Sequence, residues 1–372
     1  MRIGLDGRAA KWYRGTGIGN YTYQLISAIN SIDNCNDYLL FAPEDSDLDI
    51  NFSKHFTVRN ITENNTDNFW DSINIPNILL NNEVEIYHIP QNGIGMPNSK
   101  ECPFIITLHD IIPYRLPDTV GKSYLKIFLE QMPDIIERCD GIITVSEYSK
   151  NDIIEEFNFP RDKIFVTYLA AESIYKPIDK NKSRDIIKHL YGIDYPFILY
   201  VGGFSPRKNI VGLIEAFSKF SVKNSEFKLV IAGKKGISHT LYKEKAEALG
   251  IEDKVVFPGF ISMEHLPYLY NASDLFVYPS FYEGFGLPPI EAMSCGVPVV
   301  TSNTTSIPEI VGDNAFLINP SDIDQLSSAL DVMINDEIIR KDFISRGIKR
   351  AGELSWYNTA VQTLSAYKSI TN

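Results

Sequence analysis

The chain has 372 residues, more than one ordinary hydrophobic core takes in, so two domains are expected. Its formal net charge of −12 argues against general nucleic-acid binding, which needs a basic surface, but leaves room for a small basic pocket that takes one diphosphate. Hydrophobic residues make up 44% and charged residues 22%, a globular composition that excludes a disordered or fibrous protein.

Short apolar runs alternate with helix-length amphipathic segments from one end of the chain to the other. Strands that are apolar throughout and separated by helices favour parallel sheets covered on both faces, an α/β architecture. The runs form two sets of about six, which predicts two doubly wound domains. The expected strands are Arg2–Asp6, Tyr38–Ala42, Ile86–Ile89, Phe104–Leu108, Gly141–Val145 and Lys163–Tyr168, then Phe197–Val201, Lys228–Ala232, Lys254–Phe257, Leu275–Tyr278, Pro298–Thr301 and Phe316–Ile318. The clearest helical patterns are Gly19–Asn30, Tyr124–Arg138, Ile210–Phe220 and Tyr242–Leu249.

The polar stretch Ala170–Arg184 is the best domain boundary. It is too short for a flexible tether, so it indicates a hinge between packed domains. We place an N-terminal domain at residues 1–172 and a C-terminal domain at 173–355. The last segment, residues 356–372, has an apolar helical face without a clear partner in its own domain, and the pattern alone does not say which domain it packs on.

Two features bear on the cellular compartment. No apolar stretch approaches the roughly 18 residues of a membrane span, and no basic region leads into a long apolar segment at the start, so we expect no signal peptide. The four cysteines are scattered, which excludes common zinc-ribbon spacings and fits reduced thiols. We expect a cytoplasmic protein.

Peripheral contact with the inner membrane face is a further hypothesis. A helix near residue 125 would bring together Tyr124, Leu125, Phe128 and Leu129, with Lys122 and Lys126 beside them. The alternative is a helix packed on its own sheet, and the overall negative charge opposes binding to anionic lipid.

A glycine-rich turn, Gly15-Thr-Gly-Ile-Gly19, follows the first expected strand and opens the first helix. Glycines there let a ligand approach the backbone, and free N–H groups at a helix start favour an anion. The dinucleotide pattern Gly-x-Gly-x-x-Gly is incomplete, because Asn20 stands where its third glycine belongs. A plain tight turn between strand and helix remains the alternative.

The adjacent cations Arg207 and Lys208 follow the first strand of the second half and precede a helix. A helix start is itself positive, so two cations there make sense if an anion such as a diphosphate binds between them. Solvated surface cations are the alternative interpretation.

The segment Glu283 to Glu291 follows the strand Leu275–Tyr278 and combines two carboxylates with glycines and a Pro-Pro pair that can open a helix. We expect Glu291 in the first helical turn, where a carboxylate either stabilises the helix or accepts both hydroxyls of a ribose. Glu283 could reach a sugar hydroxyl.

His109 and Asp110 stand at the carboxyl end of the strand Phe104–Leu108. The carboxyl ends of strands in open α/β sheets face the ligand crevice. A structural supporting role is the alternative for this histidine. Three Asp-x-Asp pairs, Asp45/Asp47, Asp47/Asp49 and Asp322/Asp324, look like the metal and diphosphate motif of another large transferase fold, but they lie in an acidic loop and a helix start. No metal site is expected.

Taken together, these residues resemble family 4 of the retaining glycosyltransferases, which adopt the GT-B fold of two doubly wound Rossmann-like domains facing across a cleft. The similarity runs over nearly the whole chain. Its segments are Gly15–Tyr21, His109–Asp110, Pro206–Lys208, Tyr282–Pro288, Glu291–Val299 and Pro308–Asp313. In that family the C-terminal helix crosses back onto the first domain.

The resemblance implies a donor site residue by residue. Glu291 would hold the ribose, Glu283 would contact the donor sugar, and Arg207 with Lys208 would neutralise the diphosphate. His109 would lie against the sugar on the acceptor side. Backbone and aromatic contacts to phosphate and base would come from Gly17, Gly19, Phe260, Ile261, Phe285, Gly286 and Leu287. No cofactor is implied beyond the nucleotide sugar itself.

The implied activity is retaining, metal-independent transfer of a hexosyl group to a glycan or lipid-linked acceptor in polysaccharide biosynthesis. The runs 232–236 and 306–310 look most like mannosyltransferase members, so GDP-mannose is the first expected donor and a UDP-sugar the second. Two departures, Gly203 where some members carry a cation and Ser205 where an acidic residue is common, leave the donor open.

Retention without an obvious nucleophile suggests front-face attack assisted by the leaving phosphate. A double displacement through Asp110 or Glu283 competes with it. Another enzyme of the same fold, such as an epimerase or a phosphorylase, and a non-catalytic nucleotide-sugar-binding module remain alternatives.

Overall fold

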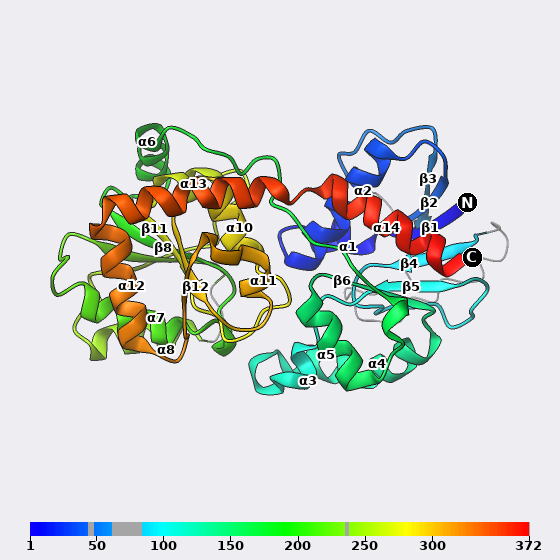
Figure 1. Cartoon of the computed structure of the whole chain (residues 1–372), viewed down its shortest axis with the longest axis horizontal. Coiled ribbons are helices and arrows are strands. Elements are labelled where there is room, and N and C mark those ends of the chain that lie inside the picture. The colour runs from blue at the N-terminus through cyan, green and yellow to red at the C-terminus, as the bar shows by residue number, and fades with distance from the viewer. Residues whose placement is uncertain (44–47, 62–83, 235–237, 372) are drawn as a thin grey trace. The chain divides into compact units, whose positions relative to one another are not determined.

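The computed structural model describes residues 1–43, 48–61, 84–234 and 238–371 (Figure 1). The chain forms two compact units. Unit 1 comprises Met1–Leu169 with Ser355–Asn372, and unit 2 comprises Ala170–Leu354. The division falls three residues before the boundary expected from the sequence, and the C-terminal segment lies in unit 1.

The sheet of unit 1 has parallel strands in the order β3-β2-β1-β4-β5-β6-β7. Their bounds are β1 Arg2–Asp6, β2 Asp37–Pro43, β3 Phe56–Ile61, β4 Ile86–Ile89, β5 Phe104–Thr107, β6 Gly141–Thr144 and β7 Ile164–Val166. The sequence pattern missed β3, so the expected set of six strands is wrong by one. Only the two end residues of this edge strand are buried, and an apolar run is therefore absent.

Helices cover both faces of this sheet, and their bounds are α1 Arg8–Trp12, α2 Gly17–Ile32, α3 Ile112–Arg115, α4 Lys122–Arg138, α5 Glu147–Phe157 and α14 Trp356–Thr371. Helix α2 begins two residues earlier than predicted because Thr16 caps it, accepting a hydrogen bond from the Gly19 amide. Helix α14 packs on α2, β6 and β7 and buries Thr359, Ala360 and Tyr367 (Figure 1). Its apolar face thus belongs to the core of unit 1.

The sheet of unit 2 is also parallel, in the order β10-β9-β8-β11-β12-β13. Its strands are β8 Phe197–Val201, β9 Lys228–Ala232, β10 Val255–Gly259, β11 Leu275–Tyr278, β12 Val299–Ser302 and β13 Phe316–Ile318. Its helices are α6 Lys180–Tyr191, α7 Ile210–Phe220, α8 His239–Ala248, α9 Leu266–Ala272, α10 Leu287–Ser294, α11 Ile307–Val311, α12 Ile323–Asn335 and α13 Glu337–Glu353.

In each sheet the order in which successive strands are added changes side once, between β1 and β4 in unit 1 and between β8 and β11 in unit 2. In open α/β sheets, ligands bind outside the carboxyl ends of the strands at such a switch point. The segments that follow β8 and β11 hold Arg207, Lys208 and Glu283. Contrary to expectation, the glycine-rich turn does not follow β1 directly, because the short helix α1 intervenes and the turn opens α2. The topology alone therefore indicates that these loops form the ligand site.

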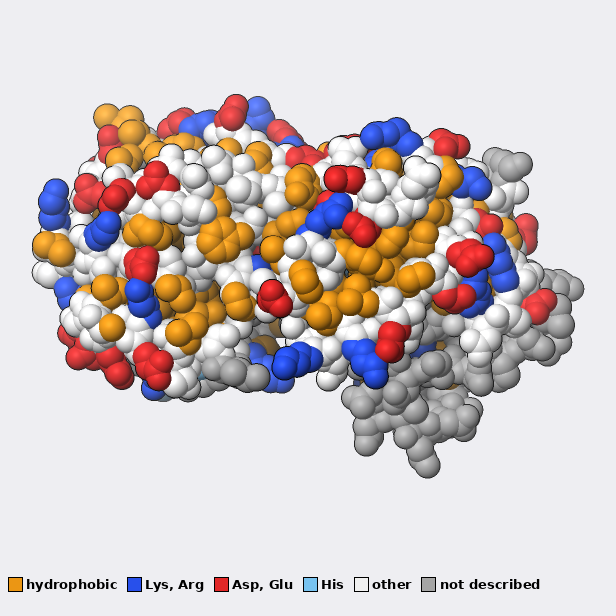
Figure 2. Space-filling model, turned by 90° about the horizontal axis from the view of Figure 1, so that it is seen from below, with side chains coloured by type: hydrophobic (Ala, Val, Ile, Leu, Met, Phe, Trp, Pro, Cys, Tyr) orange, Lys and Arg blue, Asp and Glu red, His pale blue; other side chains and the backbone are white. Residues whose placement is uncertain are grey.

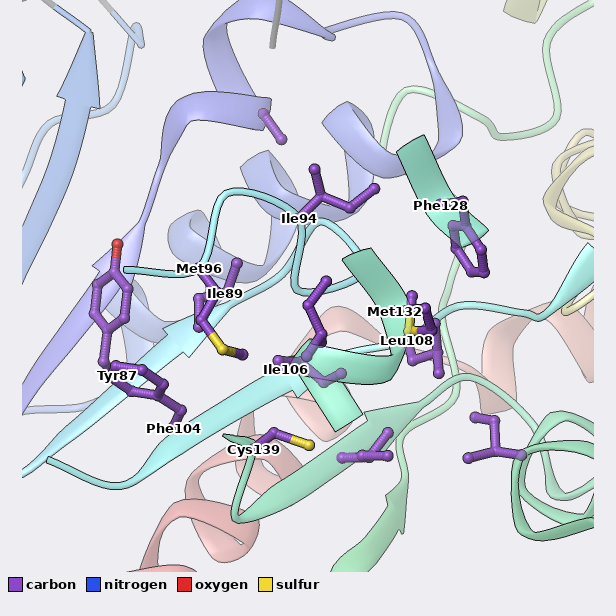
Figure 3. Close-up of a cluster of buried hydrophobic side chains, with 14 of the residues drawn as sticks. Tyr87, Ile89, Ile94, Met96, Phe104, Ile106, Leu108, Phe128, Met132 and Cys139 are labelled. Carbon is purple, nitrogen blue, oxygen red and sulfur yellow. The ribbon is translucent and has the colours of Figure 1, made fainter. Parts of the chain in front are cut away.

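Figure 3 shows part of the apolar core of unit 1, where Phe128 and Met132 of α4 pack with Ile106 and Leu108 from β5 and the residues after it. Phe128 is fully buried, and the Tyr124 hydroxyl accepts a hydrogen bond from Asn92 at 3.1 Å. Two of the four side chains proposed to contact lipid therefore face the protein, so that part of the membrane hypothesis is wrong. On that helix Leu129 is exposed, and Lys126 pairs with Glu130.

Acidic and basic side chains are interspersed over the face shown in Figure 2. Among the described residues, no helix is long and apolar enough to cross a membrane. All four cysteines are free thiols, and Cys139 and Cys295 are buried.

Candidate functional site

Unit 2 gathers charged side chains at the carboxyl edge of its sheet. A 3₁₀ turn, Pro206–Lys208, follows β8, and Glu283 follows β11, the neighbouring strand. Lys208 Nζ donates to Glu283 Oε1 at 2.6 Å, and Arg207 Nη1 lies 2.9 Å from the same oxygen. Arg207 also donates to the Tyr282 carbonyl at 2.8 Å. Both cations thus share one oxygen of the Glu283 carboxylate.

Lys208 and Glu283 are buried, each less than a tenth exposed, whereas the Arg207 side chain is 18% exposed. Burial alone would raise the pKa of Glu283, but the charges of Arg207 and Lys208 outweigh it and lower that pKa to about 2. Glu283 is therefore ionised at neutral pH and held by two cations. The cluster carries a net charge of one positive unit, and it can exchange part of its internal pairing for an incoming anion.

Two tyrosines from the expected strands of unit 2, Tyr200 and Tyr278, support the cluster. Lys208 Nζ donates to the Tyr278 hydroxyl and lies 4.8 Å from the centre of its ring. The Tyr200 ring stacks on Tyr278, with 5.9 Å between centroids, and its hydroxyl donates to the Gly203 carbonyl. Both tyrosines occur near the carboxyl ends of neighbouring strands, and that position is the signal that could have found them.

The loop from Glu283 to Leu287 is fixed by the segment after β12. Thr305 Oγ1 accepts from the Glu283 amide at 3.1 Å, and Ser306 Oγ donates to the Glu283 carbonyl at 2.8 Å. Gly286 caps α10 with φ +97°, and a Cβ there would lie 2.5 Å from Ile307, so only glycine fits. The buried Phe285 and the partly exposed Leu287 flank this cap, and the Leu287 amide is one of the N–H groups that the helix start leaves open.

Glu291 is the fifth residue of α10, so the expectation that it lies in the first turn is wrong. The helix begins at Leu287, directly after the left-handed cap at Gly286 and before the Pro-Pro pair that was expected to open it, so Glu291 falls in the second turn. The Tyr270 hydroxyl donates to Glu291 Oε2 at 2.8 Å, and Tyr175 supplies a second hydroxyl. Burial of the carboxyl group raises the pKa of Glu291 to about 7, Tyr270 opposes that rise, and the charge of Glu172 adds to it.

Phe260 and Ile261 follow β10 at the same edge of the sheet. Phe260 is 64% exposed, which is unusual for a phenylalanine, whereas Ile261 is buried. An exposed aromatic ring at the carboxyl edge is available to stack on a planar ligand.

In the glycine-rich turn of unit 1, the structure requires glycine at position 19 but not at position 17. A Cβ on Gly19 would lie 1.9 Å from the Tyr13 carbonyl oxygen, so the close backbone packing of the turn itself requires this glycine. Its amide is bonded to Thr16 Oγ1 at 3.2 Å. The tight-turn interpretation therefore accounts for Gly19. Gly17, by contrast, is exposed at the first position of α2 with open space where a Cβ would be.

His109 follows β5 and is held by its surroundings on two sides. Its Nε2 lies 3.0 Å from the Pro90 carbonyl oxygen, and its ring meets the Tyr21 ring edge-on with 4.6 Å between centroids. A carbonyl only accepts, so Nε2 carries the proton. Burial lowers the pKa of His109 to about 4, and the bond to Pro90 offsets this only in part. His109 is therefore a neutral imidazole whose Nδ1 has an acceptor lone pair at neutral pH.

Asp110 and the third Asp-x-Asp pair have local structural roles. Asp110 Oδ1 accepts from the Ile112 amide at 3.0 Å. Asp322 caps α12, and Asp324 pairs with Lys219 at 2.5 Å. The other two pairs include Asp45 or Asp47, which lie outside the described residues. Within the described part of the chain, no group of three or more histidine, cysteine or acidic residues is arranged to hold a metal ion.

Two family models match the chain. The model described as Glycosyltransferase Family 4 matches residues 15–171, and the one described as Glycosyl transferases group 1 matches residues 182–350. The O-antigen chain mannosyltransferase B of Escherichia coli is 36% identical over 284 residues, which is 76% of this chain and 74% of that protein. The chain is a family 4 glycosyltransferase.

A second relative shows how far the similarity extends. The serotype-specific mannosyltransferase WbdA of Escherichia coli is 30% identical over 264 residues, 69% of this glycosyltransferase but 32% of WbdA. The chain thus spans about a third of that relative's length. The solved structure of Anabaena HepE in complex with UDP and glucose has a TM-score of 0.73 and 18% identity, and it covers 99% of this chain and 100% of its own.

These findings confirm the GT-B fold, the family and the enzyme class expected from the sequence. In this glycosyltransferase the structure brings Arg207, Lys208 and Glu283 into direct contact, whereas Glu291 lies in a separate group with Tyr270 and Tyr175. Gly17, Gly19 and His109 lie in the other unit. The two groups of unit 2 stand at the two ends of one loop-and-helix segment, Glu283 to Glu291.

Proposed function

We propose that this glycosyltransferase moves a mannosyl group from a nucleotide diphosphate sugar to a glycan or lipid-linked acceptor, with retention of configuration and without a metal. GDP-mannose is the first donor to test and UDP-sugars are the second. The names of the relatives support mannose, and the UDP bound in HepE supports a nucleoside diphosphate. O-antigen relatives favour polysaccharide biosynthesis as the setting.

The observation that carries the proposal is the ionic cluster of Arg207, Lys208 and Glu283 at the switch point of unit 2. A diphosphate that enters here meets a buried lysine and a partly exposed arginine that are already held in place, so little reorganisation is needed as charge grows on the leaving group. Lys208 is additionally fixed by the Tyr278 hydroxyl. Such fixed cations stabilise the departing diphosphate in the way a metal does in other transferases.

Glu291 suits the ribose because its carboxylate is already oriented by two tyrosine hydroxyls. Phe260, exposed after β10, suits stacking on the base. Glu283 would reach a hydroxyl of the transferred sugar with the oxygen that its cations leave available.

Front-face transfer fits the chemistry of these residues. The bond from the anomeric carbon to the phosphate oxygen breaks, a bond to the acceptor oxygen forms on the same face, and the acceptor proton passes to the leaving phosphate. A double displacement needs a carboxylate that attacks the anomeric carbon. Glu283, with a pKa of about 2 and two cations on it, is a poor nucleophile, and Asp110 is engaged in a turn. His109 is neutral, so it would hold a sugar hydroxyl by accepting its proton in a hydrogen bond at Nδ1.

Thermal unfolding against a panel of nucleotide sugars identifies the donor, because a ligand that binds only the folded state raises the melting temperature. NMR of the product then reads the anomeric configuration directly. The same transfer run in EDTA should proceed at an unchanged rate. Inversion at the anomeric carbon, or loss of turnover in EDTA that one divalent metal restores, would contradict the proposed mechanism.

A further inference from the structure

A continuous chain of buried polar groups crosses unit 1 from α14 to α2. The Tyr367 hydroxyl lies 2.7 Å from His88 Nδ1, and His88 Nε2 lies 2.8 Å from Thr107 Oγ1. Thr107 Oγ1 lies 2.9 Å from the Tyr21 hydroxyl. All four side chains are completely buried. These hydrogen bonds thus connect the C-terminal helix α14 through β4 and β5 to α2, the helix that opens with the glycine-rich turn.

This series of hydrogen-bonded side chains ends at Tyr21, whose ring contacts His109. The Tyr21 ring stands perpendicular to the imidazole, with 4.6 Å between centroids, and on another side it packs near Trp356 at 6.1 Å. On the segment after β4, Pro90 accepts from Nε2 and Asn92 accepts from the His109 amide, and Ser149 of α5 donates to the His109 carbonyl at 3.3 Å. Tyr21 is therefore the ring that limits how far the imidazole can tilt about its bond to Pro90.

Packing alone does not call for these residue types. Burying a hydroxyl or an imidazole costs free energy unless every polar atom finds a partner, and phenylalanine or valine would fill similar volume without that cost. A fully satisfied buried network instead fixes one arrangement of its side chains. Here the hydroxyl of Tyr21 is fixed from the sheet, and the ring of Tyr21 is thereby placed against His109.

We propose that Tyr21 is a positioning residue for His109, anchored by the buried chain Thr107–His88–Tyr367, and that it keeps the Nδ1 of His109 oriented toward the sugar. The inference deepens the proposed function and rests on the role given there to His109. It assigns the C-terminal helix a part in catalysis, because Tyr367 holds the far end of the chain. A substitution at Tyr21 should therefore act on turnover through His109 and only there.

A double-mutant cycle tests this coupling. Tyr21→Leu should lower kcat about tenfold in the natural background, with a smaller change in the donor KM, and less than twofold when His109→Gln is already present. Tyr21→Phe keeps the ring and loses only the anchor, so its kcat should fall about threefold. Tyr87→Phe is the matched control, since Tyr87 is a buried tyrosine of β4 whose hydroxyl finds no partner among the described residues. Equal losses from Tyr21→Leu in both backgrounds would overturn the proposal.

A second readout does not depend on activity. In the full-length protein with ¹⁵N-labelled histidine, the His109 signals, assigned by their loss in His109→Gln, should show a single neutral form protonated at Nε2. Tyr21→Leu should shift them toward the other tautomer, Tyr21→Phe should shift them less, and Tyr87→Phe should leave them unchanged. An unchanged His109 spectrum in Tyr21→Leu, with the fold intact by thermal unfolding, would also overturn the proposal. Absence of transfer from every donor in the natural enzyme would instead count against the proposed function and leave the spectral test standing.

Discussion

Glu291 should make donor binding depend on pH. Its carboxyl group has a pKa raised to about 7 by burial, with Glu172 adding to the rise against the opposing Tyr270 hydroxyl. The ionised carboxylate offers acceptor sites on both oxygens to the two ribose hydroxyls, whereas the protonated acid is itself a donor. Binding of the donor should therefore select the ionised form.

The magnitude follows from the ionised fraction. With a pKa of about 7, that fraction falls from about 90% at pH 8 to about 10% at pH 6. The apparent Kd rises by the reciprocal of the competent fraction, so it should increase about tenfold between these two pH values. Glu291→Gln should bind weakly with no such dependence. Glu172→Gln removes a like charge near Glu291 and should move the dependence to lower pH.

Calorimetric titration is the assay, and the ligand should be an intact nucleotide sugar. A free nucleoside diphosphate has a terminal phosphate that itself titrates near about pH 6, which would mask the effect. A Kd that stays constant from pH 6 to pH 8 in the natural enzyme would refute this reasoning. A slope that persists in Glu291→Gln would assign the dependence to another group.

The same pKa predicts a cost in stability. The folded state binds the proton of Glu291 more tightly than the unfolded state, so this contribution is fully present below about pH 4.5 and is lost as pH rises through about 7. At about 1.4 kcal/mol for each pH unit across that window, the loss approaches about 3 kcal/mol. Glu291→Gln should therefore be more stable than the natural protein in urea at pH 8 and nearly equal to it at pH 5. Equal stability at pH 8 would show that the carboxyl group is better solvated than the structure indicates.

Three further predictions follow from the other site residues. Lys208→Ala should lower kcat about a hundredfold while Glu291→Ala mainly raises the donor KM, because the charge on the diphosphate grows in the transition state; steady-state kinetics with the reverse pattern would contradict these roles. His109→Gln should keep a measurable fraction of kcat and His109→Ala far less, and any acidic limb due to His109 should lie near pH 4 instead of the ordinary 6.5, as a pH–rate profile would show. Burial lowers the pKa of His109 to about 4 and that of His88 to about 3, so the folding stability that they support should be lost as pH falls below about 6.5. The measurement is urea denaturation of Glu291→Gln, which lacks the opposing titration of Glu291, and a stability that is flat between pH 6.5 and 5 in that variant would contradict the prediction.

The parallel sheets could be predicted from the sequence because strands buried on both faces are apolar throughout. The burial of β4, β5 and β6 at every position shows why that signal was strong. Strand β3 lacks it, since its middle four residues are exposed. The hydrophobic pattern reports burial, so an exposed edge strand leaves little trace in it.

The contacts of the site were harder to predict than its residues. Lys208 and Glu283 are 75 residues apart, and only the adjacency of β8 and β11 brings them together. Strand order cannot be read from a list of strands, so the pairing of both cations with Glu283 could not be predicted. Tyr278, Tyr270 and Tyr175 were missed for another reason: tyrosine fills an apolar pattern with its ring, and the pattern does not show where its hydroxyl points.

The two units share a doubly wound topology but differ in the charges that they carry at the carboxyl edges of their sheets. At the edge of unit 2, Arg207 and Lys208 outnumber the carboxylate that they share, so this edge keeps a positive charge. At the edge of unit 1, Arg8 is matched by the buried Asp6, and His109 and His88 are held neutral by burial. A leaving diphosphate gains negative charge as its bond to the sugar breaks, whereas a sugar hydroxyl carries none. Fixed cations at the edge of unit 2 therefore suit the charged leaving group of the proposed transfer, and neutral hydrogen-bonding groups at the edge of unit 1 suit an uncharged hydroxyl.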